Sequence, residues 1–152
     1  MRITDLLSKE SIRLDGVSST KKETIRAMAD LMEKSGKISD KNAYVEGLIK
    51  REEESTTAIA IPHYKGSAVT KPGLAAMVIK DGTDFDSIDG EPVKLIFAIA
   101  APDTKENVHL DVLSKLSVLL MDEDFSQKLI NAKSVEEFIS GFLFGSSSRA
   151  SG

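Results

Sequence analysis

The chain contains no cysteine. A disulfide framework, thiolate catalysis and cysteine-ligated metal sites are therefore excluded. An excess of positive charge is also missing, because 24 acidic residues outnumber 20 lysines and arginines and leave a formal net charge of −4. Proteins that bind nucleic acid usually carry a basic face or a high isoelectric point, so this class of function is disfavoured.

Long hydrophobic runs are missing as well. The apolar run Leu95–Ala101 is far shorter than the roughly 20 residues that a membrane-spanning helix needs. Residues 1–7 have no long apolar core followed by a small-residue cleavage site, which a secretory signal peptide would show. We therefore expect a cytoplasmic protein.

The length of 152 residues suits one domain that can bury a full core without disulfides. Residues 145–152 consist of glycine, serine, alanine and arginine, a composition typical of flexible linkers. We expect a folded domain over residues 1–144 and a flexible Ser/Gly tail or linker over residues 145–152.

Two capping boxes mark the starts of helices. At Thr20–Glu23 and at Ser134–Glu137, a hydroxyl can accept from a backbone N–H while the glutamate reaches back. Apolar residues recur at helical spacing after both boxes. The same spacing predicts further helices after Asp40, after Asn107 and over Phe125–Ala132.

Three segments are typical of β-strands: Thr57–Ile61, Leu74–Ile79 and Val93–Ala101. The last two are nearly continuous apolar runs, as in strands that helices cover on both faces. A turn is predicted at Lys80–Gly82. Helices precede and follow these strands, which predicts an α/β fold: a single layered domain with a central mixed, mostly parallel sheet and helices on both faces.

The only two histidines stand at similar places in this pattern. His63 comes just past the predicted strand that ends at Ile61, and His109 falls in the first turn of the helix after the strand ending at Ala101. In open α/β sheets, functional groups gather beyond the carboxyl ends of strands, and helix N-termini favour anions. We therefore expect both imidazoles to converge on one site that suits phosphate.

These residue types suit phosphoryl transfer through a phosphohistidine. Imidazole has an unperturbed pKa of about 6.5, so it can be a neutral nucleophile in the cell. One ring nitrogen of His63 would attack phosphorus in line, while an acceptor held the other nitrogen and fixed the tautomer. Positioning and charge stabilisation would come from four further side chains: His109, Arg51, Ser55 and Thr56.

Structural roles are the alternative for each of these residues. A histidine that follows a strand is more often structural than functional, and Arg51 lies in a charged helix end that is usually solvated. Two neutral imidazoles without an obvious carboxylate ligand make a poor metal site. We expect no metal and no cofactor.

The residues before the first histidine resemble a known family. The segment Arg51–Thr57, REEESTT, and the string Ile59–His63, IAIPH, resemble the signature of fructose/mannitol-type enzyme IIA domains of the bacterial sugar phosphotransferase system. The DGEPV segment at Asp89–Val93 and the helix start at His109 are similar to the family too. The likeness extends over residues 1 to about 144.

The resemblance implies a phosphotransferase component that carries a phosphohistidine. His63 would accept the phosphoryl group from the phosphocarrier HPr and pass it to a cysteine of enzyme IIB, for fructose-type sugar uptake through the membrane enzyme IIC. His109 would match the family's second active-site histidine, and Arg51 and Thr56 match positions near that site. The absence of cysteine agrees with this role, because the acceptor thiol belongs to another domain.

Two alternatives stay open, and one of them follows from a departure from the family. The family usually has a glycine-rich turn before the IAIPH string, whereas here Ala58 runs directly into Ile59. Glycines allow close backbone approach to a ligand, so a shortened loop would suit a scaffold that HPr binds but cannot phosphorylate. The other alternative is a nitrogen-related phosphotransferase regulator, with the same fold and histidine but with control of partner proteins as its role.

Overall fold

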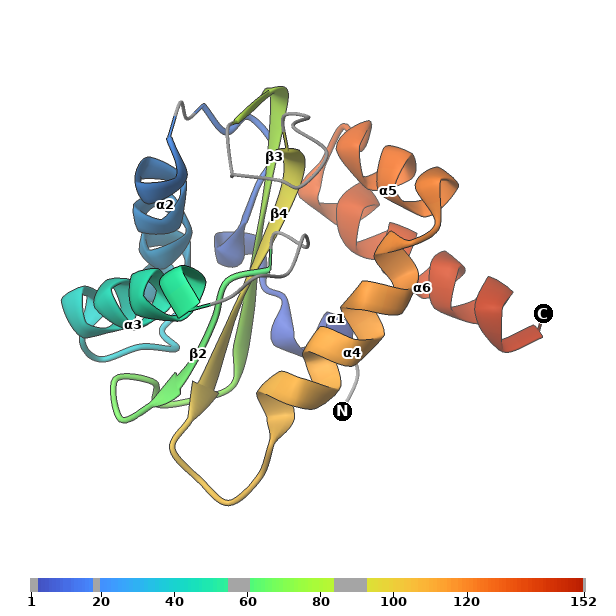
Figure 1. The fold of residues 1–152 in the computed structure, drawn as a ribbon. Coiled ribbons are helices and arrows are strands. Elements are labelled where there is room, and N and C mark those ends of the chain that lie inside the picture. Colours follow the sequence, from blue (N-terminus) through green and yellow to red (C-terminus); the bar gives the residue numbers. More distant parts are fainter. Residues whose placement is uncertain (1–2, 18–19, 55–60, 84–92, 152) are drawn as a thin grey trace.

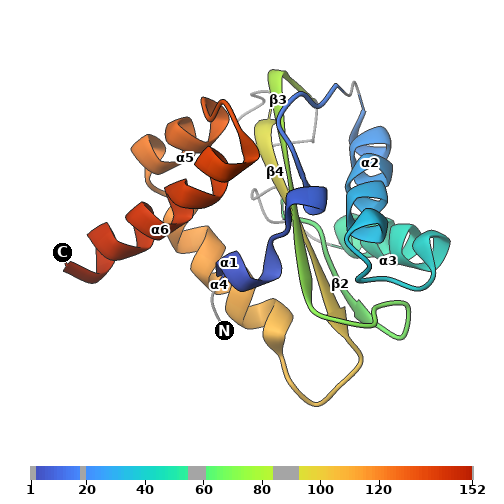
Figure 2. The same ribbon diagram turned by 180° about the vertical axis from the view of Figure 1, so that it is seen from behind.

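A computed structural model describes residues 3–17, 20–54, 61–83 and 93–151. Its centre is a four-stranded sheet with helices on both faces (Figure 1 and Figure 2). In order across the sheet, the strands are β1 (Ile12–Arg13), β3 (Gly73–Thr83), β4 (Val93–Pro102) and β2 (His63–Gly66). This architecture confirms the predicted layered α/β fold.

The sheet is mixed. β1 is parallel to β3 and β2 is parallel to β4, while the central pair β3 and β4 is antiparallel. The parallel ladders are short, and the antiparallel ladder is the longest within the described residues. Ile99 of β4 stands between His63 on one side and Leu74 on the other, which ties the first histidine to the middle of the sheet.

One face of the sheet is covered by four helices. They are α1 (Ile3–Leu6), α4 (Val108–Leu120), α5 (Glu123–Ile130) and α6 (Val135–Ser151). Four phenylalanines meet in this layer with ring centroids 5.3–6.3 Å apart: Phe97, Phe125, Phe138 and Phe142. Aromatic pairs in tilted and edge-on arrangements contribute beyond simple burial, so this cluster fastens α5 and α6 to β4.

The opposite face is covered by two helices, α2 (Lys21–Lys34) and α3 (Lys41–Glu54). Both begin where the sequence predicts. Oγ1 of Thr20 accepts from the N–H of Glu23 at 3.1 Å, and Oδ1 of Asp40 accepts from the N–H of Ala43 at 3.0 Å. Side chains alternate along β3 and β4, so successive residues enter the two cores in turn.

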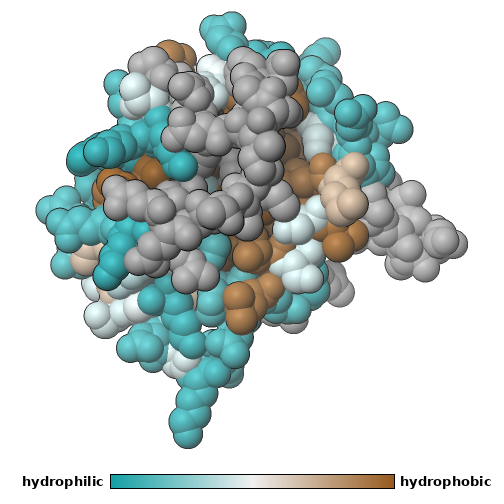
Figure 3. Space-filling model, in the orientation of Figure 1, coloured by the Kyte–Doolittle hydropathy of each residue, from teal (hydrophilic) through white to brown (hydrophobic). Residues whose placement is uncertain are grey.

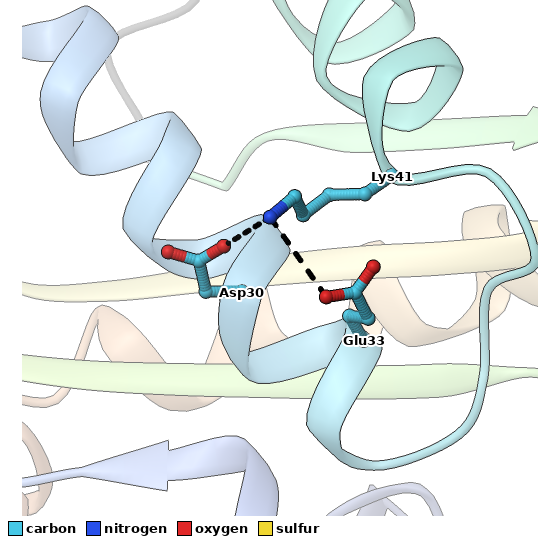
Figure 4. A network of polar contacts seen from close by, with 3 residues as sticks. All are labelled: Asp30, Glu33 and Lys41. Carbon is cyan, nitrogen blue, oxygen red and sulfur yellow. Dashed lines mark hydrogen bonds and ion pairs between the residues drawn. The ribbon is translucent and has the colours of Figure 1, made fainter.

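A polar network joins α2 to the start of α3 (Figure 4). Nζ of Lys41 lies 3.0 Å from Asp30 and 3.8 Å from Glu33. The hydrogen bond to Asp30, together with the charges of both carboxylates, raises the pKa of Lys41. These side chains are exposed, so solvent screens the network and it adds little to stability.

The predicted turn at Lys80–Gly82 is wrong. β3 continues through these residues to Thr83, with an irregular register between Val78 and Thr83. Gly82 has φ +80°, a conformation that glycine adopts without strain. A bulge and a turn both place a glycine after a polar pair, so the local sequence does not distinguish them.

Three short elements near the N-terminus have no counterpart among the sequence-based predictions: α1, the 3-10 helix Lys9–Ser11 and β1. Each is too short to show a hydrophobic period. The buried hydroxyl of Ser11 donates to the carbonyl oxygen of Leu74 at 2.9 Å. This long-range hydrogen bond holds the N-terminal segment on β3.

Helix α6 continues to Ser151, so the backbone of residues 145–151 is helical where the composition predicts a flexible tail. The division into a domain over residues 1–144 and a linker over residues 145–152 stays a prediction. Within the described ranges, no helix combines the length and the apolar character that crossing a bilayer requires.

Candidate functional site

His63 is the first residue of β2, at an edge of the described sheet. Of the predicted strand Thr57–Ile61, residues 57–60 lie outside the described residues, and the buried Ile61 belongs to no strand. His63 is thus itself part of a strand, which the sequence analysis does not predict. The last residue of this apolar run, Ile61, packs in the hydrophobic core next to β2.

The backbone around His63 is fixed to β4. The N–H of Ile99 donates to the carbonyl of Pro62 at 2.9 Å, and His63 is paired with Ile99 in the parallel ladder. The hydroxyl of Tyr44, in α3, donates to the carbonyl oxygen of Ile99 at 3.1 Å. Burial raises the pKa of Tyr44, so this hydroxyl remains a protonated donor. The histidine thus stands on the sheet itself.

The ring of His63 is held by the chain just before it. Its Nδ1 lies 3.0 Å from the carbonyl oxygen of Ile61. A carbonyl oxygen can only accept, so Nδ1 carries the proton in this hydrogen bond. In a neutral imidazole this leaves Nε2 as the nitrogen with a lone pair available for attack. The acceptor that a nucleophilic histidine needs is here a main-chain carbonyl.

The second histidine lies beside the first. His109 is in the first turn of α4, and the centroids of the two rings are 6.3 Å apart with 27° between their planes. The chain turns back after β4, so α4 begins next to the paired strands β2 and β4 (Figure 1). Both side chains are half-buried. The predicted convergence of the two imidazoles is confirmed.

Of the other residues predicted for the site, the structure describes only the backbone of Arg51. Ser55 and Thr56 lie outside the described residues. Arg51 belongs to the last turn of α3, and its side chain is also outside the described part of the chain. The proximity of these three side chains to His63 stays a prediction.

Lys65 and Asn107 are neighbours of the histidines that the sequence analysis missed. Nζ of Lys65 lies 3.4 Å from Oδ1 of Asn107, the residue before α4. Lys65 follows His63 by two residues, and residues two apart share one face of a strand. The sequence analysis predicts no strand over His63–Gly66, so it does not place Lys65 beside His63.

The charge around the two rings favours an anion. The ammonium of Lys65 stands beside the N-terminal end of α4, where the helix dipole is positive. In the described part of the chain, no three histidine, aspartate or glutamate side chains gather as metal ligands would. The two imidazoles, the Lys65 ammonium and the start of α4 can together hold a phosphoryl group by hydrogen bonds and positive charge.

Comparison with known proteins agrees with this geometry. Residues 5–143 match the family model described as "Phosphoenolpyruvate-dependent sugar phosphotransferase system, EIIA 2". The chain is 42% identical over 143 residues to the PTS system fructose-specific EIIABC component of Bacillus subtilis, covering 91% of this chain and 22% of that protein. It is 39% identical over 141 residues to the PTS system fructose-specific EIIA component of Haloferax volcanii, covering 88% and 92%.

Solved structures show the same fold. The nitrogen regulatory protein IIA-Ntr of Neisseria meningitidis is similar with a TM-score of 0.82 and 28% identity, over 92% of this chain and 98% of that one. The IIA mannitol domain of Escherichia coli, solved in complex with phosphorylated IIB mannitol, is similar with a TM-score of 0.74 and 26% identity, over 90% and 96%. The chain belongs to the EIIA 2 family of the phosphoenolpyruvate-dependent sugar phosphotransferase system.

Proposed function

We propose that this protein carries a phosphoryl group on Nε2 of His63. The observation that carries the proposal is the pairing of the two histidines at 6.3 Å, with Nδ1 of His63 held by the carbonyl of Ile61. This hydrogen bond leaves Nε2 as the nucleophile and prevents the ring from turning over. Membership of the EIIA 2 family supports a role as a phosphotransferase component.

The reaction is a pair of in-line displacements. The lone pair of Nε2 attacks the phosphorus of a phosphohistidine on the donor, so a new N–P bond forms as the donor's N–P bond breaks. In the second step a cysteine thiolate attacks the same phosphorus, and His63 leaves as a neutral imidazole. No cofactor is needed, because phosphoryl transfer depends mainly on positioning and on stabilisation of charge.

Further residues would stabilise the phosphoryl group. His109 lies close enough to contact a group carried by His63 and stands at the positive end of α4. Arg51, Ser55 and Thr56 would complete the phosphate site, and the family resemblance supports Arg51 and Thr56. A guanidinium at that position would pair with two phosphoryl oxygens at once.

The donor is HPr and the acceptor a cysteine of enzyme IIB, with the membrane enzyme IIC taking up a fructose-type sugar. The chain spans only 22% of a relative named as a fructose-specific EIIABC component, and a family relative forms a complex with phosphorylated IIB. Exposed apolar residues lie along α4 and at its end, beginning next to His109: Leu110, Val118 and Met121. Figure 3 shows apolar surface in this region, as a protein-docking face requires.

A regulatory role is the second candidate. The nitrogen regulatory protein IIA-Ntr of Neisseria meningitidis shares the fold over nearly the whole chain. A regulator would accept the phosphoryl group on His63 and change its affinity for a partner protein, without passing the group to IIB. Transfer to IIB therefore separates the two candidates.

The proposed function is tested by incubating the protein with phosphoenolpyruvate, enzyme I and HPr. We expect one added phosphoryl group, stable in alkali and lost in acid, that peptide mapping places on His63. His63→Ala should abolish the added mass. Because the chain has only two histidines, His109→Ala is the matched control and should still be phosphorylated.

Onward transfer is measured next, with purified IIB and its cysteine-to-serine variant as the control acceptor. We expect His109→Ala to slow transfer to IIB by about 10²-fold, because a stabilising group is removed from the transition state. Phosphorylation of a folded His63→Ala protein would contradict the assignment of the carrier residue. Absence of phosphorylation on the folded wild type would favour a scaffold instead.

A further inference from the structure

We propose that Lys65 is a positioning residue for phosphoryl transfer. Through Asn107 it fixes the first turn of α4, and with it His109, against the strand that carries His63. The proposal rests on the function proposed above for the two histidines. The supporting observation is a pair of contacts between β2 and the start of α4.

Side chains alternate along β2. Tyr64 packs edge-on against Tyr44 in the core under α2 and α3, with 5.8 Å between ring centroids. His63 and Lys65 therefore both project from the other face of β2, toward α4. His63 meets His109 there, and Lys65 meets Asn107.

The two contacts form a matched pair. Moving two residues along β2, from His63 to Lys65, corresponds to moving two residues back along the other segment, from His109 to Asn107. Val112, one turn further along α4, is buried in the core. Together with that anchor, the two contacts at this spacing hold the start of the helix against β2.

Burial does little to hold this part of the chain. Residues Asp103–Asn107, which lead into α4, are all exposed. Asn107 occupies the N-cap position, where asparagine normally accepts from a backbone N–H of its own helix. Its side chain makes no such hydrogen bond, and Oδ1 faces the Lys65 ammonium instead. The side chain thus connects strand to helix.

A double-mutant cycle tests the pair. Lys65→Met and Asn107→Ala should each lower kcat for transfer from His63 to IIB by about three- to tenfold with KM unchanged, because a small displacement of a positioned group slows the reaction. The double variant should be no slower than either single variant. Lys65→Arg should restore most of the rate, and Lys71→Met, at an exposed lysine, should behave as wild type.

A second measurement does not depend on phosphorylation. The amides of Leu110 and Asp111 donate to the backbone carbonyl of Asn107 at 3.1 and 3.3 Å, so they report on the helix start. Their hydrogen exchange in the unphosphorylated protein should be about threefold faster or more in both single variants. Failure of the wild type to accept phosphate would refute the proposed function, yet the exchange rates would still decide the contact.

Three results would overturn the role of Lys65. Unchanged exchange of the two amides would show that the contact does not hold α4. Independent, additive losses from the two substitutions would show that they act separately. A raised KM for IIB with unchanged kcat would place Lys65 in partner docking.

Discussion

Tyr44 shows how a residue remote from the chemistry shapes the site. Its hydroxyl binds the carbonyl of Ile99, the residue of β4 that is paired with His63. The ring is fully buried between α3 and the sheet, so the hydroxyl cannot exchange this partner for water. A change at Tyr44 is therefore felt at the backbone of the histidine.

We predict that the difference in stability between wild type and Tyr44→Phe depends on pH. Burial raises the pKa of Tyr44 above the unfolded value of about 10. Below that value the hydroxyl is neutral in both states, and wild type should be more stable by about 1 kcal/mol. Above it the unfolded state loses a proton that the folded state keeps, so wild-type stability falls by about 1.4 kcal/mol per pH unit.

Denaturant unfolding of both proteins between pH 8 and pH 11 measures this difference. Other ionising groups contribute equally to the two proteins and cancel. The advantage of wild type should vanish at about pH 10.7. A difference that stays constant over the whole range would mean that the hydroxyl ionises equally in both states.

At the scale of elements, the packing of α3 on β2 depends on an aromatic ring set against glycine. Tyr64 of β2 lies against Gly47 of α3, where a Cβ would overlap two ring carbons and lie 3.1 Å from Cγ, the base of the ring. Either the ring or the helix would have to shift to admit a side chain. The absence of a side chain at Gly47 lets α3 approach β2 at this distance.

We predict that the effect of Gly47→Ala on the free energy of unfolding has opposite signs in wild type and in Tyr64→Ala. In wild type it should destabilise by about 1–3 kcal/mol, because overpacking outweighs the gain in helix propensity. In Tyr64→Ala the ring is gone, and the same change should stabilise by up to about 1 kcal/mol. The four proteins of this cycle can be compared by denaturant unfolding, and an equal effect in both backgrounds would rule out the steric coupling.

The elements that could be predicted are those with several turns or a long apolar run. Capping residues Thr20 and Asp40 mark α2 and α3, and the continuous apolar runs mark β3 and β4. β1 has two residues and is defined by its pairing with β3, which no local pattern reveals. The sequence does not reveal β2 either, because the half-buried residues His63–Gly66 show no alternation of apolar and polar residues.

The site follows the same division. The convergence of His63 and His109 could be predicted, because both lie close to buried segments that the sequence marks. The contact between Lys65 and Asn107 depends on which residues of β2 face α4, and the sequence does not predict that strand. The pairing of strands determines which side chains meet, and the spacing of residues in the sequence does not reveal that pairing.

For the whole molecule, the sheet separates two cores of different make-up. The core under α4, α5 and α6 holds the four clustered phenylalanines, whereas the core under α2 and α3 holds methionines and Tyr44. Both cores use alternate side chains of the same two strands, β3 and β4. Unfolding of one therefore exposes the shared strands, and we expect a single cooperative transition.

The domain boundary predicted at residue 144 can be tested by truncation. A chain of residues 1–144 keeps Phe138 and Phe142, and its free energy of unfolding should lie within about 0.5 kcal/mol of the full chain. A chain of residues 1–134 loses both rings, each worth about 3–5 kcal/mol, and should not fold. Loss of more than about 2 kcal/mol in the longer fragment would place residues 145–152 inside the folded unit.

The edge position of β2 has a kinetic consequence. Within the described sheet, His63 stands on a strand with a neighbour on one side only, and its backbone is already fixed to β4. A partner that approaches along this edge finds the histidine and its tautomer in place. Because the histidine needs no rearrangement before docking, the association rate constant of the partner should fall in proportion to solvent viscosity, whereas kcat for the transfer step should not.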